Sequence, residues 1–200
     1  MNKIKSIAFT LAETLIVMGI IGVVSALVVP MVKDNSNEHV NVAKAKKLYS
    51  ELVSAYEQAT IKYGHPGDWG GSDSTFANRL QEYLNADVSS NKLTLKDGAT
   101  VVVTYHSDTD YELLLDVDGP KKGTNAPADG EDQFYASVNL TDLVNIPKLD
   151  PFKYCYDTIS TSTNPNSNNF LYWVVLFGNQ DYMDSTCNST LTWNNKLTCK

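Results

Sequence analysis

Arginine is nearly absent from this chain of 200 residues, because Arg79 is the only one. Lysine and arginine together number 16 against 23 aspartates and glutamates, which gives a formal net charge of −7. A protein that binds nucleic acid through its phosphates needs a basic surface. The charge balance therefore argues against this class, and we expect no direct nucleic-acid partner.

Motifs of the common enzyme classes are also missing. The chain contains no G-x-S-x-G, H-E-x-x-H, P-loop, C-x-x-C or G-x-G-x-x-G sequence. Its three histidines are isolated from one another along the chain. The three cysteines are too few for a disulfide scaffold and have no zinc-site spacing. We therefore expect a protein that is not an enzyme.

Apolar character is concentrated in one run near the N-terminus. The 19 residues Thr14–Val32 carry no charge and lie between Glu13 and Lys33. As a helix this run would measure about 29 Å, close to the thickness of a bilayer core. Lys3 and Lys5 precede it, which predicts an N-terminus kept in the cytoplasm and an exported remainder.

Three interpretations of this run compete. It can be a secretory signal cleaved after Ala26, or a plain transmembrane anchor. The third interpretation depends on Glu13. A carboxylate near the start of a membrane helix costs free energy, and neither a secretory signal nor a plain anchor needs such a residue.

The residues around Glu13 are distinctive. The sequence Ala8-Phe9-Thr10-Leu11-Ala12-Glu13-Thr14-Leu15 resembles the class III leader of type IV pilins and type II secretion pseudopilins. The resemblance implies that a prepilin peptidase cuts between Ala8 and Phe9, that the Phe9 amine is methylated, and that the apolar segment stays on the mature chain. Pro30 stands where many family members have a proline. Ala8 departs from the family pattern, which usually has glycine.

This resemblance gives Glu13 an assembly role. A buried carboxylate is tolerable when it is paired. The new Phe9 amine could pair with Glu13 of the same chain or of an adjacent subunit, which would set the register of an otherwise uniform apolar bundle. Pro30 removes one backbone hydrogen bond and should bend or loosen the helix.

The remaining sequence predicts helices followed by strands. Leu48, Leu52, Ala55, Ala59 and Tyr63 recur at helical spacing, so we expect one long helical spine over residues 9–63, irregular over residues 30–37. A short helix is expected over 75–84. Strands are predicted over residues 92–95, 100–105, 111–115, 134–138 and 171–177. The expected fold class is α+β: a spine, transmembrane in its first half, packed on a C-terminal antiparallel sheet.

Acidic residues crowd the segment between residues 108 and 132. Asp116, Asp118 and Asp132 are the candidate ligands of a calcium ion, because this cation prefers carboxylate oxygens. Calcium binding by some pseudopilins makes such a site an implication of the resemblance as well. The spacing is not that of an EF-hand, and a solvated turn rich in Asp and Gly is the favoured alternative.

The cysteines allow more than one pairing. A bridge between Cys187 and Cys199 would close a loop of about a dozen residues, and pilins often fasten their C-terminal segment in this way. Pairing of Cys155 with either partner stays open.

Together these observations predict a pilin or pseudopilin: a structural subunit of a type IV pilus or type II secretion-like filament. The expected parts are a leader (1–8), a transmembrane and assembly segment (9–32) and an exported globular domain (33–200). The expected location is the inner membrane, with a single pass, followed by an extracellular or periplasmic filament. Expected partners are the prepilin peptidase, other subunits and an inner-membrane assembly platform. The alternative is an exported or membrane-tethered binding protein or adhesin with a calcium-binding acidic loop.

Overall fold

The computed structural model describes residues 11–106, 110–119, 130–141, 145–151, 164–184, 187 and 190–193. Within α1, the side chains of Leu11 and of residues 27–37 lie outside this description. The chain divides into two compact units, Met1–Asn37 and Glu38–Lys200.

One helix, α1 (Leu11–Tyr63), contributes to both units. Its backbone is helical without interruption through Pro30, so the expected irregularity over residues 30–37 is wrong. The helix tolerates a proline when the neighbouring turns keep their own hydrogen bonds. It ends at Gly64, whose φ of 75° is easily adopted by glycine alone.

Two short helical segments follow α1 in the second unit. The 3₁₀ helix η1 (Pro66–Trp69) begins with His65, whose Nδ1 accepts a hydrogen bond from the Gly67 amide at 3.0 Å. The helix α2 (Asp73–Gln81) is capped by Ser72, whose hydroxyl accepts from the Thr75 amide at 3.3 Å. The helix expected over residues 75–84 is therefore present but begins and ends earlier.

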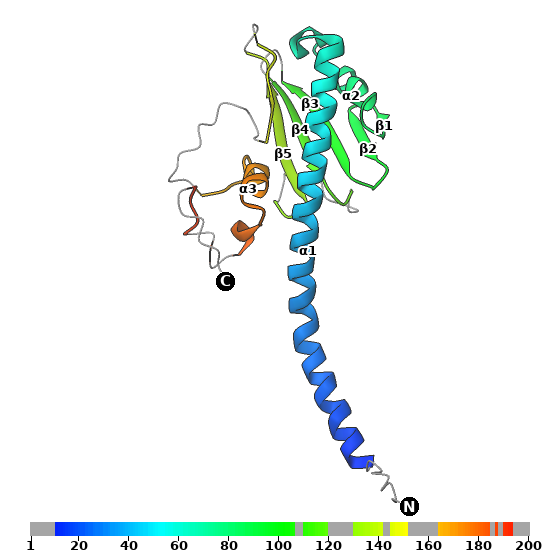
Figure 1. The fold of residues 1–200 in the computed structure, drawn as a ribbon, viewed down its shortest axis with the longest axis vertical. Coiled ribbons are helices and arrows are strands. Elements are labelled where there is room, and N and C mark those ends of the chain that lie inside the picture. Colours follow the sequence, from blue (N-terminus) through cyan, green and yellow to red (C-terminus); the bar gives the residue numbers. More distant parts are fainter. Residues whose placement is uncertain are drawn as a thin grey trace, which may run out of the picture. The chain divides into compact units, whose positions relative to one another are not determined.

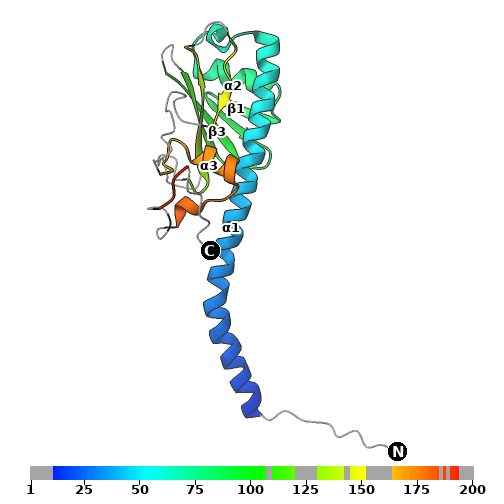
Figure 2. The same cartoon turned by 60° about the vertical axis from the view of Figure 1, so that its left-hand side comes forward.

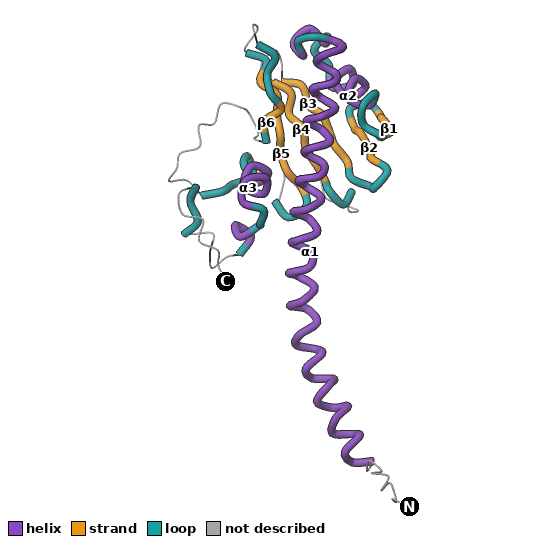
Figure 3. The backbone as a smooth tube through the Cα atoms, in the orientation of Figure 1, coloured by secondary structure: helices purple, strands orange, loops and turns teal. Residues whose placement is uncertain are grey.

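Six strands form one antiparallel sheet in which every strand pairs with its neighbour in sequence, in the order β1-β2-β3-β4-β5-β6 (Figure 3). The strands are β1 (Ala86–Ser89), β2 (Lys92–Leu95), β3 (Thr100–His106), β4 (Asp110–Asp116), β5 (Gln133–Asn139) and β6 (Leu149–Asp150). The strands predicted over 92–95, 100–105, 111–115 and 134–138 are confirmed. The short strands β1 and β6 were not predicted.

The core of the second unit lies between α1 and one face of the sheet (Figures 1 and 2). Leu48, Leu52, Ala55 and Ala59 of α1 are buried, as their spacing predicts, and Tyr63 packs against the edge of this core. The sheet contributes alternate residues of each strand. On the central strands these are Val101, Val103, Tyr111, Leu113, Leu115, Phe134, Ala136 and Val138.

Residues 171–177 form a helix and not the predicted strand. The helix α3 (Phe170–Phe177) ends at Gly178, which adopts a left-handed φ of 75°. Its aromatic and β-branched composition favours a strand, but Leu171, Trp173 and Val174 are buried together on one helical face. Tertiary packing therefore decides this element. The 3₁₀ helix η2 (Asp181–Met183) follows it.

Candidate functional site

The first unit presents an apolar helix surface. Within the described side chains, Ala12–Ala26 are all exposed, and the large apolar residues among them are 50% to 66% accessible. A Cβ atom added at Gly19 or Gly22 would meet nothing within 4 Å, so both positions leave room for a close helix neighbour. This is a larger continuous apolar surface than monomeric soluble proteins commonly expose.

Within the described residues, no helix combines the length and the apolar character needed to cross a bilayer. The expected transmembrane first half of the spine is therefore wrong. The expected single-pass location in the inner membrane is wrong for the same reason.

The residues predicted for processing and assembly are only partly described. Ala8 and Phe9 lie outside the described residues, so the cleavage site stays a prediction. Glu13 lies in the first turn of α1, where a carboxylate interacts favourably with the positive end of the helix dipole. Its side chain is exposed. Pro30 lies inside α1, in the stretch where only the backbone is described.

The three candidate calcium ligands lie where β4 ends and β5 begins. Asp116 is paired in register with Gln133, whose side-chain amide donates to Asp116 Oδ2 at 3.2 Å. The Val117 amide donates to the Asp132 carbonyl at 2.9 Å, which fixes the two strand ends together. Asp116 and Asp132 are buried, whereas Asp118 is exposed.

The electrostatic state of Asp116 follows from this position. Burial raises the pKa of its carboxyl group, and the negative charges of Asp132 and Asp118 add to that effect. The hydrogen bond from Gln133 acts in the opposite direction. Asp116 Oδ1 is buried and has no hydrogen-bond partner in the described part of the chain. Asp116 is thus held in a site that disfavours its charged form.

A calcium site requires several oxygen ligands around the same ion. Among the described residues, no three His, Cys, Asp or Glu side chains are grouped closely enough to hold a metal ion. Residues 120–129 of the acidic segment lie outside the description. The calcium site therefore stays a prediction, and the geometry described favours a turn.

Cys187 is buried and disulfide-bonded. Cys155 and Cys199 both lie outside the described residues, so the predicted pairing of Cys187 with Cys199 remains a prediction. The bond fastens a segment that follows η2 directly.

A second set of contacts was not expected from the sequence. The side-chain amide of Gln180 donates to the carbonyls of Gly130 and Glu131, at 2.6 and 2.7 Å. The Tyr182 hydroxyl donates to the Gly130 carbonyl at 2.7 Å. The backbone N–H of Gln180 donates to Glu38 Oε1 at 3.0 Å. These contacts hold the segment after α3 against α1 and against the turn before β5. The bonded residues are 49 to 142 positions apart in the sequence, so no local sequence pattern predicts them.

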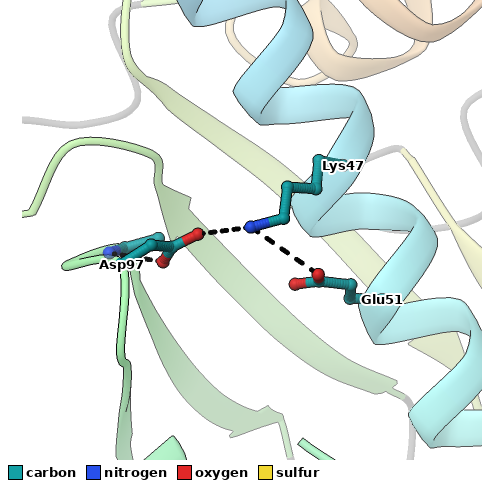
Figure 4. Close-up of polar contacts among 4 residues, drawn as sticks. Lys47, Glu51 and Asp97 are labelled. Carbon is teal, nitrogen blue, oxygen red and sulfur yellow. Dashed lines mark hydrogen bonds and ion pairs between the residues drawn. The ribbon is translucent and has the colours of Figure 1, made fainter. Parts of the chain in front are cut away.

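A charged cluster joins α1 to the turn between β2 and β3 (Figure 4). Lys47 Nζ lies 2.7 Å from Asp97 Oδ2 and 3.7 Å from Glu51 Oε1. The hydrogen bond with Asp97 raises the pKa of Lys47, and the same bond lowers the pKa of Asp97. All three side chains are solvent-accessible, so this cluster fixes orientation more than it adds stability.

The described residues combine an apolar helix surface in the first unit with a charged cluster in the second. Such an arrangement suits association with other chains. No protein-family model, curated protein or solved structure matches this chain.

Proposed function

We propose that the chain is a structural subunit, a pilin or pseudopilin, of a type IV pilus or type II secretion-like filament. A prepilin peptidase processes it before Phe9, and the mature chain assembles through its N-terminal helix. The work of the protein is structural and not catalytic. Its partners are the peptidase and other filament subunits.

The exposed apolar surface of α1 over Ala12–Ala26 carries this proposal. Burial of apolar area contributes roughly 25 cal/mol per Å², so covering eight large apolar side chains gives a strong driving force for association. The same segment of further copies is a fitting cover, because its exposed glycines permit close helix packing.

Glu13 supplies the specificity that an apolar surface lacks. Helices covered only by aliphatic side chains can slide past one another with little change in energy. A carboxylate that has to meet the Phe9 amine of a neighbouring copy penalises the wrong positions, because each misplaced subunit leaves a charge without its partner.

The decisive measurement is the N-terminus of the mature protein in its native cell. We expect mass spectrometry to find a chain that begins with N-methyl-Phe9. A chain beginning at Leu27 would identify a cleaved secretory signal and contradict the proposal, because such a chain has lost Glu13 and the exposed apolar segment. An intact Met1 would contradict processing by the peptidase.

Assembly provides an independent test. Glu13→Gln keeps the size and polarity of the side chain but removes its charge. We expect this variant to be processed at Phe9 and to form at least tenfold less filament than the wild-type chain. Glu51→Gln, which makes the same change elsewhere on α1, serves as a control for expression and folding. Equal filament yields from wild type and Glu13→Gln would contradict the register role.

A further inference from the structure

A groove lies between α1 and β6 in the second unit. Its volume is about 320 Å³, and its lining includes Val53 and Glu57 of α1 together with Ile146 and Lys148. Its base is fixed by two hydrogen bonds from α1. The Tyr49 hydroxyl donates to the Leu149 carbonyl at 2.9 Å, and the Tyr56 hydroxyl donates to the Pro147 carbonyl at 2.7 Å. We call it the α1–β6 groove.

Apolar side chains at the α1–β6 groove are exposed. Ile146 is about half exposed, and Ile61, one helical turn beyond Glu57 on the same face of α1, is 85% exposed. Glu57 is exposed and has no ion-pair partner in the described part of the chain. The groove therefore offers an apolar surface beside a carboxylate.

The helix α3 lies further toward the start of the second unit than β6, on the same side of α1 (Figure 3), and two exposed apolar residues in and after it are called the α3 ridge. These are Leu176 of α3 and Met183 of η2, each about half exposed. The end of α3 lies beside Lys46, whose Nζ is 3.0 Å from the position of a Cβ atom on Gly178. Lys46 is exposed and, within the described residues, forms no ion pair.

The groove and the ridge each carry both a lysine and an acidic residue, so opposite charges on two copies can face one another. Lys46 and Glu57 are 11 residues apart on α1, which is close to three helical turns, so both lie on one face. A shift of about 17 Å along the helix would bring Lys46 of one copy to the level of Glu57 of another. The same shift carries the α3 ridge toward the α1–β6 groove. Lys148 at the groove and Asp184 after the ridge form a second complementary pair.

We propose that the α1–β6 groove receives the α3 ridge of a second copy of this chain, with Lys46 of one copy paired to Glu57 of the next. The contact is head-to-tail, because the ridge and the groove are different surfaces of one molecule. Head-to-tail contacts that do not close into a ring extend as filaments. This inference rests on the proposed function, since a filament places its subunits parallel and staggered.

Charge reversal tests the pairing in the full chain, co-expressed with a prepilin peptidase. Lys46→Glu and Glu57→Lys each place two like charges together, and we expect each variant alone to form at least tenfold less sedimentable filament. Lys44→Glu makes the same change on the opposite face of α1 and should assemble like wild type. Thermal unfolding of each variant checks that the fold is retained.

Mixing the two reversed variants gives the sharpest result. Where the two variants alternate, the carboxylate introduced by Lys46→Glu meets the ammonium group introduced by Glu57→Lys, and every second contact keeps the wild-type pair. We therefore expect the mixture, and the double variant, to recover wild-type filament yield at low salt. Recovery as a closed dimer, seen by sedimentation, would contradict the head-to-tail arrangement.

The failures of this inference and of the proposed function can be told apart. If the wild-type chain forms filaments and both single variants do so equally well, the Lys46–Glu57 contact is wrong and the proposed function stands. If the processed wild-type chain stays monomeric at every concentration, both are wrong. Loss in the single variants without recovery in the mixture would also overturn the pairing.

Discussion

The guanidinium carbon of Arg79 lies 4.5 Å from the centre of the Tyr63 ring and so joins α2 to the end of α1. The same group lies 5.1 Å from the Trp69 ring. A planar cation above two aromatic faces gains electrostatic energy from both rings, and arginine suits this geometry better than lysine does. The only arginine of the chain is therefore placed where three helical segments meet.

Replacing this side chain should weaken the fold. We expect Arg79→Ala to lower the free energy of unfolding by about 1–2 kcal/mol, because two cation–π contacts are lost. Arg79→Lys keeps the charge and should lose roughly half as much. Urea denaturation followed by tryptophan fluorescence measures both. Equal stability of wild type and Arg79→Ala would show that the stacked arrangement contributes nothing.

Asp116 should make stability depend on pH. Its folded-state pKa is raised, so well below the ordinary aspartate pKa of 3.8 the carboxyl group is protonated in both the folded and the unfolded state and has no effect on stability. As the pH rises through the interval between 3.8 and the raised pKa, the unfolded state loses its proton first, and stability is lost. Asp116→Asn should remove this loss and be more stable than wild type at pH 7. Urea midpoints of both proteins across pH 4 to 7 test the sign, and a less stable Asn variant would contradict it.

Calcium should have little effect on this chain. A solvated turn is the favoured interpretation of the acidic segment, so we expect the melting temperature to be the same in 1 mM calcium chloride and in EDTA. A rise that disappears in Asp118→Asn would instead identify the acidic segment as a calcium site. Magnesium chloride at the same ionic strength is the control for general screening of the acidic surface.

Gly130 should not tolerate a side chain. Its φ is 80°, and an added Cβ would overlap the ring of Phe170. We expect Gly130→Ala to cost about 2–4 kcal/mol, from a strained backbone and a steric overlap with the ring. Gly98→Ala is the matched control, since φ is 94° there and nothing lies within 4 Å. It should cost only about 1 kcal/mol. Similar losses in the two variants would argue against the contact with Phe170.

Gln180 should matter more than an ordinary surface glutamine. It is buried, and its amide satisfies two carbonyls of the turn before β5. Gln180→Leu removes one hydrogen bond from each carbonyl, while Tyr182 still donates to Gly130 and Asn41 to Glu131, so we expect a loss of about 1–2 kcal/mol. Gln58→Leu, on the exposed side of α1, should be close to neutral. Guanidinium unfolding of the two variants makes the comparison.

The predictable part of the fold consists of elements with a clear local period. The stripe through Leu48, Leu52, Ala55 and Ala59 repeats every three or four residues, and these residues are buried. The alternation in β3 to β5 likewise identifies these central strands. In α3, the run of aromatic and β-branched residues favours a strand by composition, and only burial of Leu171 and Val174 on one face makes it helical.

The transmembrane expectation failed for a different reason. Counting uncharged residues from Thr14 onward measures composition, whereas no helix of the described residues has both the length and the apolar character needed to span a bilayer. The hydrogen bonds of Gln180 could not be predicted from the sequence for a different reason. Gln180 and Glu38 are 142 residues apart, and no local pattern reports such a pair. Glu13 and the Asp116 segment were identifiable only because their residue types are unusual in their surroundings.

The nearest-neighbour order of the sheet has a consequence for how the chain folds. Each strand pairs with the next one in sequence, so the sheet can grow hairpin by hairpin with short loop closures, which is a comparatively fast route. The stripe of α1 is synthesised before any of these strands, and it stays exposed to water until β3 to β5 exist. Early in synthesis, the chain therefore presents apolar helix surface with nothing of its own to bury it. That interval is when aggregation, or capture by a chaperone, would compete most strongly with folding.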